Sequence, residues 1–248
     1  MPVWFAHNKT TRNAVFLQDR RAHSNKLLDS LPQASRKRLL AVAEPVALEY
    51  KQVLATKGGA LTHAFFPTTS FISLLVPSDK GRIEVAIVGR EGLFGLGVAF
   101  GVRESDVEAI VQGAGAALKV SAPDLRRFLK DDRAFRERLD RYAYVMLNVL
   151  ARNAACNRFH RVEQRMARWL LMSADRAQSA MFDITHAFLA EMLGVRRVGV
   201  TTTANKLQDQ GLITYSRGTV AIRDRDGLKR LACGCYREDH ETYKKHFG

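Results

Sequence analysis

Residues 185–213 read THAFLAEMLGVRRVGVTTTANKLQDQGLI, and this pattern predicts two helices joined by a tight turn. Thr185 is a suitable N-cap, and the apolar residues after it are spaced to face a core. Gly194 lies where the first helix should end, because glycine tolerates the left-handed conformation at a helix terminus. The second helix should expose Arg196, Arg197, Thr201, Thr202 and Lys206. These features indicate a helix-turn-helix, whose second helix enters the major groove of DNA. An ordinary helical hairpin is the alternative.

Two short runs of branched and aromatic residues follow this stretch directly. Residues 212–215 (LITY) and 219–222 (TVAI) are separated by Ser216, Arg217 and Gly218. Such runs around a turn glycine predict a β-hairpin. A helix-turn-helix followed by a hairpin is a winged helix, and Arg217 at the tip of the wing suits a phosphate contact.

The composition favours a polyanionic partner. The chain has 248 residues, enough for two domains, with 46% apolar and 26% charged residues and a net charge of +14. Charge alone does not separate DNA, RNA and an anionic membrane. The apolar runs are too short to span a bilayer, and the N-terminus lacks a secretory pattern. The three cysteines form no disulfide framework, so we expect a cytoplasmic protein without a membrane partner.

Before residue 131 the sequence shows short β-type runs in place of helical periodicity. We expect a flexible arm over residues 1–23 and an effector-like domain over residues 24–130. Within that domain, short β runs punctuated by Gly, Pro and Ser indicate a small jelly roll. The predicted strands cover residues 46–54, 64–66, 71–76, 83–88, 107–112 and 116–120.

Residues 131–158 predict a dimerisation helix. Apolar residues recur there in alternating steps of four and three, which is the a/d pattern of a coiled coil. We therefore expect a parallel homodimer through Phe135, Leu139, Tyr142, Met146, Val149 and Asn153. Asn153 would fix the register of the two helices. The alternative is an amphipathic helix that lies on its own β domain. The pattern breaks at residues 157–160, where we expect a hinge to the winged-helix domain over residues 159–248.

This α+β order of jelly roll, long helix and winged helix resembles the Crp/Fnr superfamily of bacterial transcription regulators over nearly the whole chain. Residues 66–75, residues 84–92 (EVAIVGREG) and the winged helix carry the resemblance. The family's turn glycine matches Gly194, and its guanine-reading arginine matches Arg197. The glutamate common in the recognition helix falls on Val198 and the preceding serine on Arg196, so we expect a different operator sequence.

The resemblance implies a homodimeric regulator that reads an inverted repeat in double-stranded DNA, with RNA polymerase as a candidate partner. Arg196 and Arg197 would read bases, since arginine makes the commonest specific contact, to guanine. Thr201, Thr202 and Lys206 would support the readout. A signal would act by moving the helix seam and the hinge at residues 157–160.

The stretch of this chain that matches the effector site of the resembled family departs from the family's pattern. Members that bind cyclic nucleotides hold the phosphate with an adjacent Arg-Ser or Arg-Thr pair. The matching stretch is Arg103-Glu104-Ser105-Asp106, where the pair is split and two acids would repel a phosphate. We expect a cyclic-nucleotide-binding-like domain that does not depend on cyclic nucleotide. A strictly cyclic-nucleotide-responsive regulator is the alternative.

No cofactor, metal or catalytic site is expected from the sequence. Iron–sulfur sensors of this family use cysteines near the N-terminus, and here none precedes Cys156. Cys233 and Cys235 with His240 resemble metal ligands, but they fit no standard zinc spacing, and ordinary cysteines are favoured. Pro2, His7 and His63 suggest haem ligands, since haem sensors exist in the resembled family, but lone histidines are more often surface or core residues. Without a catalytic triad, or the carboxylate cluster that a nuclease would need, we expect no enzyme.

Overall fold

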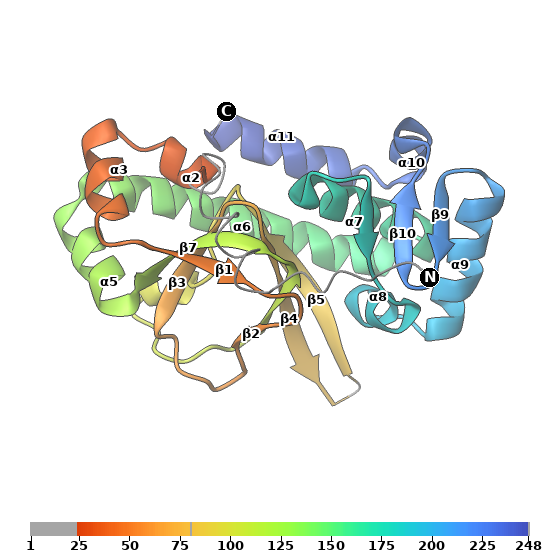
Figure 1. Cartoon of the computed structure of the whole chain (residues 1–248), viewed down its shortest axis with the longest axis horizontal. Helices are drawn as coiled ribbons and strands as arrows, with labels where there is room; N and C mark the ends of the chain where they lie inside the picture. The colour runs from red at the N-terminus through yellow and green to blue at the C-terminus, as the bar shows by residue number, and fades with distance from the viewer. Residues whose placement is uncertain (1–23, 80, 248) are drawn as a thin grey trace, which may run out of the picture.

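The computed structural model describes residues 24–79 and 81–247. It contains a β domain, a long helix that crosses the molecule, and a winged helix beside the β domain (Figure 1). This is the α+β architecture expected from the sequence. The arm expected over residues 1–23 lies outside the described residues. Among the described residues, no helix is long and apolar enough to cross a membrane.

The β domain consists of two antiparallel sheets. One has the strand order β1-β7-β3 and the other β2-β6-β4-β5. The strands are β1 (Glu44–Leu48), β2 (Val53–Ala55), β3 (His63–Pro67), β4 (Phe71–Ser78), β5 (Gly81–Val88), β6 (Glu108–Gly113) and β7 (Gly115–Ser121). The single strand expected over residues 46–54 is two strands, because the chain turns at Lys51, whose φ is +66°. Three short helices accompany the sheets: α2 (Lys26–Asp29), α3 (Gln33–Leu40) and α4 (Leu96–Ala99).

Two capped helices lead out of the β domain. The hydroxyl of Ser121 accepts a hydrogen bond from the backbone N–H of Asp124 at the start of α5 (Ala122–Asp131). The carboxylate of Asp132 accepts one from Phe135 at the start of α6 (Arg133–Phe159). Each cap satisfies a backbone donor that the first helical turn leaves free. The long helix α6 ends at the expected hinge, where His160 is its C-cap.

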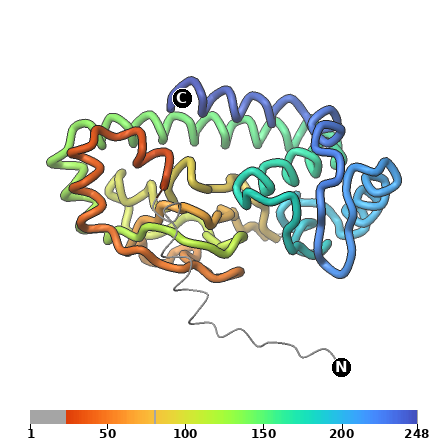
Figure 2. The backbone as a smooth tube through the Cα atoms, turned by 45° about the horizontal axis from the view of Figure 1, so that its top comes forward, coloured from red at the N-terminus to blue at the C-terminus, as the bar shows by residue number. Residues whose placement is uncertain are grey.

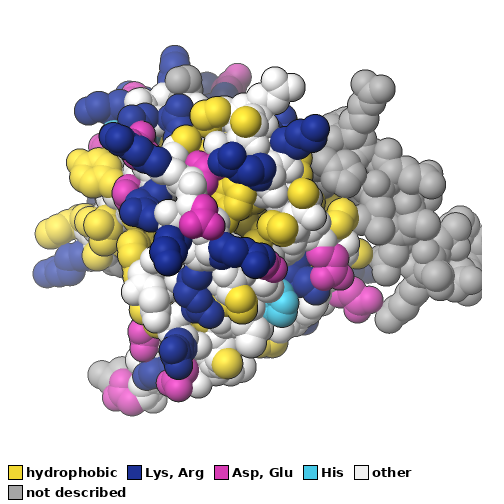
Figure 3. All heavy atoms as spheres, turned by 90° about the vertical axis from the view of Figure 1, so that its left-hand side faces the viewer, with side chains coloured by type: hydrophobic (Ala, Val, Ile, Leu, Met, Phe, Trp, Pro, Cys, Tyr) yellow, Lys and Arg dark blue, Asp and Glu magenta, His cyan; other side chains and the backbone are white. Residues whose placement is uncertain are grey.

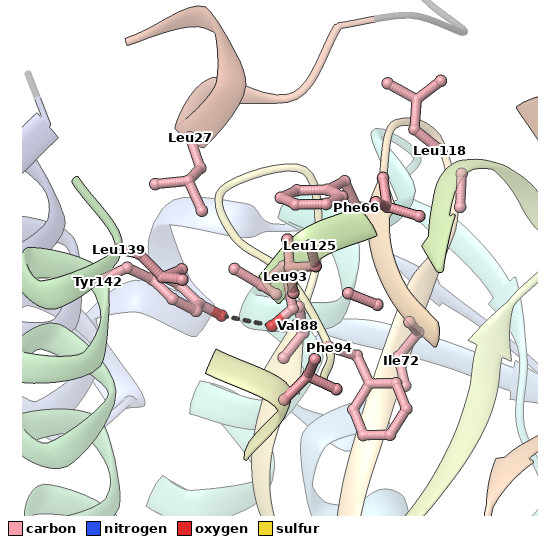
Figure 4. Close-up of a cluster of buried hydrophobic side chains, with 14 of the residues drawn as sticks. Leu27, Phe66, Ile72, Val88, Leu93, Phe94, Leu118, Leu125, Leu139 and Tyr142 are labelled. Atoms are coloured by element: carbon pink, nitrogen blue, oxygen red, sulfur yellow. Dashed lines mark hydrogen bonds between the residues drawn. The ribbon is translucent and has the colours of Figure 1, made fainter. Parts of the chain in front are cut away.

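The predicted dimer seam faces the chain's own β domain, which corrects its assignment as an interface. Phe135, Leu139, Tyr142, Met146 and Val149 are each at most 7% exposed and belong to the jelly-roll core. The hydroxyl of Tyr142 donates to the backbone oxygen of Leu93 at 3.1 Å (Figure 4). The a/d spacing is therefore that of an amphipathic helix on its own sheet, which was the alternative. Periodicity alone does not tell these two partners apart.

Asn153 is likewise engaged within the chain. Its amide nitrogen donates to the backbone oxygens of Glu84 and Val85, both at 3.1 Å, and its oxygen accepts from Arg168 at 2.9 Å. With both ends of the amide occupied, the side chain has no free group to fix the register of a partner helix. It joins α6 to strand β5 and to α7 (Val162–Ala177).

The winged helix has its own core around α7. Helices α8 (His186–Leu193) and α9 (Arg197–Asp209) pack on it together with a small sheet. That sheet has the order β8-β10-β9, with β8 (Met181–Asp183), β9 (Ile213–Ser216) and β10 (Thr219–Ile222). The hairpin β9–β10 confirms the predicted wing. Strand β8, which is only three residues long, was not predicted from the sequence.

The chain ends in two helices, α10 (Arg225–Leu231) and α11 (Cys235–Phe247). Helix α11 runs along α6, so the C-terminal segment returns to the long helix (Figure 2). Arg152 of α6 pairs with Glu238 at 3.0 Å and Asp239 at 2.5 Å. The second of these carboxylates also pairs with Arg168 of α7 at 2.6 Å. Helix α11 therefore connects the long helix α6 to α7 of the winged helix.

Candidate nucleic-acid interface

The turn between α8 and α9 is fixed by two local features that the sequence predicted. The hydroxyl of Thr185 accepts a hydrogen bond from the N–H of Phe188 at 3.1 Å, which caps α8. Gly194 has a φ of +61°, which glycine adopts without strain. A Cβ at this position would also lie 2.6 Å from the side chain of Ile83 in β5. Glycine is therefore favoured by the positive φ of the turn, and a larger residue would also have to displace the end of the Ile83 side chain.

Helix α9 has one buried and one exposed face. Val200, Ala204 and Leu207 are buried against α7 and the small sheet. The solvent face carries Arg196, Arg197, Val198, Thr202, Asn205 and Lys206. Val198 is 75% exposed, which is unusual for an apolar side chain in the middle of a polar surface. From the sequence, Val198 was expected only as a departure from a family pattern, although it directly follows the exposed Arg197.

Thr201 lies at the edge of this face and is bonded to the scaffold. Its hydroxyl is 3.2 Å from the backbone oxygen of Arg197 and 3.0 Å from Nδ1 of His186. The single hydroxyl proton goes to the backbone oxygen, so Nδ1 of His186 is assigned as the donor to Thr201. Burial, together with the nearby charge of Arg197, holds the pKa of His186 below its ordinary value of 6.5. A neutral His186 therefore ties the start of α8 to the recognition helix.

Lys206 is held by an ion pair in this structure. Its ammonium group lies 2.6 Å from the carboxylate of Glu163 near the start of α7. Lysine has a long flexible stem, and the pair is partly exposed, so the contact is weak. Among the described residues, Lys206 is the exposed basic residue of α9 that forms an ion pair.

The wing turns tightly at its basic tip. Arg217 has φ +49° and Gly218 has φ +85°, which are the two left-handed residues of a type I′ hairpin turn. The side chain of Arg217 is exposed. At the base of the wing, the ring of Tyr215 stacks on His186 with the centroids 4.2 Å apart, and its hydroxyl donates to the backbone oxygen of Ile184 at 2.5 Å. The wing is thus anchored to the start of α8, and its tip projects into solvent.

Basic side chains are not confined to the winged helix. Figure 3 shows the opposite end of the molecule, where Lys and Arg side chains are spread over the surface with acidic ones between them. Arg38, Arg127 and Arg133 of this region are mostly exposed and pair with acidic residues. The net positive charge therefore does not single out the winged helix.

The β domain contains a pocket of about 230 Å³ beside α6. Its walls are mainly apolar and include Leu61, Leu93, Phe94, Tyr142, Met146 and Leu150. The polar lining comes from Glu104, Ser105 and Asp106. The hydroxyl of Ser105 donates to the backbone oxygen of Val107 at 2.7 Å, so it is used within its own turn. Arg103 is exposed and is not part of the lining.

The candidate metal and haem residues of the sequence fall in different places. Cys233 and Cys235 meet Cys156 and His160, whereas His240 contacts Asp175 at 3.1 Å instead. The grouping of His240 with the two cysteines was therefore wrong. His63 lies at the start of β3 beside Thr62. Pro2 and His7 lie outside the described residues.

Comparisons with known proteins agree with this geometry. A family model described as a Crp-like helix-turn-helix domain matches residues 164–231. The cyclic AMP receptor protein of Thermus thermophilus is 28% identical over 174 residues, which are 64% of this chain and 79% of that protein.

Two solved structures share the fold. A transcriptional regulator of the CRP family from Thermus thermophilus is 18% identical, covers 76% of this chain and 96% of its own, and has a TM-score of 0.64. The c-di-GMP responsive global regulator of Xanthomonas campestris is 16% identical, covers 77% and 99%, and also has a TM-score of 0.64.

A β domain, a long helix and a winged helix with an exposed recognition helix together define a DNA-binding regulator of transcription. Residues 164–231 belong to the Crp-like helix-turn-helix family, and the similarity to the cyclic AMP receptor protein supports a Crp/Fnr-type transcription regulator over a larger part of the chain. This confirms the resemblance on which the sequence-based expectations rested.

Proposed function

We propose that the chain acts as a homodimer that reads an inverted repeat in double-stranded DNA and does so without cyclic nucleotide. The observation that carries this proposal is the exposed face of α9 next to a basic wing tip. A protein of this kind acts by binding and not by catalysis, and it works on DNA and RNA polymerase in the cytoplasm.

Base readout is assigned to the first turn of α9. Arg196 and Arg197 are exposed there, and an arginine can bond both O6 and N7 of a guanine. Val198 adds an apolar contact that suits the methyl group of a thymine. Thr202 supports the readout from the next turn, and Arg217 at the wing contacts phosphate. Thr201 serves mainly to hold α9 against His186, and Lys206 reaches DNA only by leaving Glu163.

The dimer is assigned to a seam one residue along α6 from the predicted one. Ala143, Leu147, Leu150 and Ala154 repeat in steps of four, three and four, which is again an a/d pattern. Leu147 is 64% exposed and Leu150 is 38% exposed. The β domain covers the inner face of α6 and α11 covers another side, so this seam is the apolar face left for a second copy. Two recognition helices would then lie about 34 Å apart.

Independence from cyclic nucleotide is supported by the polar lining of the β-domain pocket. Glu104 and Asp106 would repel a phosphate, Arg103 lies outside the pocket lining, and the hydroxyl of Ser105 is bonded to its own turn. The alternative is a regulator that depends on such a ligand. It is favoured by the likeness to a cyclic AMP receptor protein and to a c-di-GMP responsive regulator.

The test is a selection of duplexes from a random pool by the purified full chain, without nucleotide. We expect an inverted repeat whose half-sites are about one helical turn apart. Failure to enrich any sequence, or enrichment only when cyclic AMP or cyclic di-GMP is added, would contradict the corresponding part of the proposal. Calorimetry with both nucleotides measures their binding directly, and we expect no saturable heat.

A further inference from the structure

Four potential metal ligands from two distant segments meet at the hinge between α6 and α7. Cys156 lies in the last turn of α6 and His160 is its C-cap, while Cys235 is the first residue of α11 and Cys233 lies just before it. Their ligand atoms all lie within 4.8 Å of one another. The three cysteines are buried and carry no disulfide, and His160 is half-buried.

Two of the separations between these atoms are close to those of a tetrahedral site. The sulfur atoms of Cys156 and Cys233 are 3.5 Å apart, and the sulfur of Cys235 is 3.6 Å from Nδ1 of His160. Bonds of about 2.3 Å to sulfur and about 2.0 Å to nitrogen place neighbouring tetrahedral ligands about 3.5–3.8 Å apart. An iron–sulfur cluster would hold its cysteines further apart, by the width of the cluster. The geometry therefore fits one ion.

The surrounding charges suit a site of this composition. Three thiolates and a neutral imidazole around a divalent ion leave one net negative charge. Arg168, which is almost fully buried, interacts electrostatically with Cys156, Cys233 and Cys235. Its Nε–H has no hydrogen-bond partner among the described residues, while its two amino groups are fixed on Asn153 and Asp239. Arg165 interacts electrostatically with Cys156 and Cys233 and adds a second positive charge.

We propose that Cys156, His160, Cys233 and Cys235 bind a single zinc ion. Three thiolates and one imidazole form a closed set of four protein ligands, which is typical of structural zinc. The ion would join the end of α6 to the start of α11, at the point where the β domain and the winged helix meet. Zinc would thereby fix the hinge that sets the direction of the recognition helix.

The first test uses the unmodified full chain, purified under reducing conditions without a metal-affinity tag. Elemental analysis should find about one zinc ion per chain, as a closed four-ligand site requires. After removal of zinc by a chelator, added cobalt(II) should give the visible ligand-field and sulfur charge-transfer absorption of a tetrahedral thiolate site. Zinc should then displace the cobalt and remove that absorption.

Matched variants separate this site from non-specific binding. Cys235→Ser should lose most of the bound zinc and the cobalt absorption, whereas His240→Ala should keep both, because His240 lies against Asp175. Loss of a ligand should also lower the melting temperature and remove its dependence on added zinc. The zinc content, the cobalt absorption and the melting temperature are measured without DNA, so their outcome does not depend on the proposed function.

The competing use of these residues is a disulfide between Cys156 and Cys233, whose sulfurs are already close. Mass spectrometry after alkylation distinguishes the two states. Three alkylatable thiols after zinc removal support the metal site. A chain that contains less than a tenth of an equivalent of zinc, binds no cobalt when reduced, or carries this disulfide as purified would overturn the proposal.

Discussion

The guanidinium group of Arg82 in the β domain lies 2.5 Å from the carboxylate of Glu191 in the first helix of the helix-turn-helix. The same guanidinium pairs with Glu108 at 2.7 Å, so it bridges strand β6 and helix α8. Next to it, Gly194 packs on Ile83. The β4–β5 hairpin is therefore a direct contact between the domain expected to sense a signal and the helix pair expected to bind DNA.

This contact should contribute measurably to stability. Arg82 and Glu191 are each about one-third exposed, so solvent screens their attraction, and we expect a coupling energy of about 0.5–1 kcal/mol. A double-mutant cycle with Arg82→Ala and Glu191→Ala, followed by urea unfolding, gives this value. The exposed pair Arg133–Glu137 is the control and should couple by about 0.3–0.5 kcal/mol. Additive effects of Arg82→Ala and Glu191→Ala would show that the pair does not join the domains energetically.

Glu84 should make the chain less stable as the pH rises towards neutrality. Burial between β5 and α7 raises the pKa of this carboxyl from 4.5 to about 7. Between these values the folded state holds a proton that the unfolded state has released, so the free energy of unfolding falls as the pH rises from 4.5 to 7. The difference corresponds to about 3 kcal/mol. Below pH 4.5 the contribution is fully present.

The test compares the wild type with Glu84→Gln, which keeps a neutral group next to Ser73 and Trp169. The difference in unfolding free energy between the two proteins should change across pH 4.5–7 and stay constant above that range. Asp175 does not interfere, because its pKa is lowered from 3.8 to about 2 by His240, Tyr236 and Arg225 against the effect of burial, and its window lies below pH 4. A difference that is flat with pH would contradict the assignment of a neutral Glu84.

Substitutions at the adjacent residues Leu147 and Met146 of α6 should affect different properties, the first the dimer and the second the folding stability. Leu147→Glu places like charges in the proposed dimer seam and should convert the dimer to a folded monomer. Met146→Glu instead buries a carboxylate in the β-domain core and should cost about 2–5 kcal/mol of folding stability. Light scattering gives the mass, and thermal unfolding gives the stability.

Arg141→Glu is the control for these two variants, because this exposed side chain points away from the seam. It should remain a dimer of normal stability. A dimer that survives Leu147→Glu would rule out the seam of Ala143, Leu147, Leu150 and Ala154.

The sequence predicted those features that depend on residues near each other in the chain. The cap at Thr185, the turn at Gly194 and the hairpin glycine at Gly218 are local, and the structure has all three. The heptad pattern of α6 was also real, but periodicity does not say whether a face meets a sheet or a partner helix. One residue of rotation separates the buried Met146 from the exposed Leu147.

The hinge cluster could not be predicted in the same way. Cys156 and Cys233 are 77 residues apart in the chain, and only the return of α11 along α6 brings them together. The sequence offered His240 as the nearest histidine to Cys235, whereas the fold supplies His160. The pairing of Arg82 with Glu191, 109 residues away, has the same origin.

The proposed readout predicts different losses for two exposed arginines. Arg197→Ala removes a side chain that reaches base edges, so it should cost about 1–3 kcal/mol per half-site and relax the preference at one base pair. Arg217→Ala removes a phosphate contact at the wing, so it should weaken all sequences alike and reduce the salt slope by about one charge per subunit. Affinities for a selected operator and a scrambled duplex, measured across a salt series, separate the two.

Val198→Ala tests the proposed apolar contact on the same surface of α9. Because Val198 carries no charge, its loss should leave the salt dependence unchanged and lower affinity only for operators with a thymine opposite it. If Arg197→Ala instead lowers the affinity for operator and scrambled duplex by the same factor, the first turn of α9 contacts phosphates only. In that case recognition of the operator has to come from elsewhere on α9 or from the shape of the DNA.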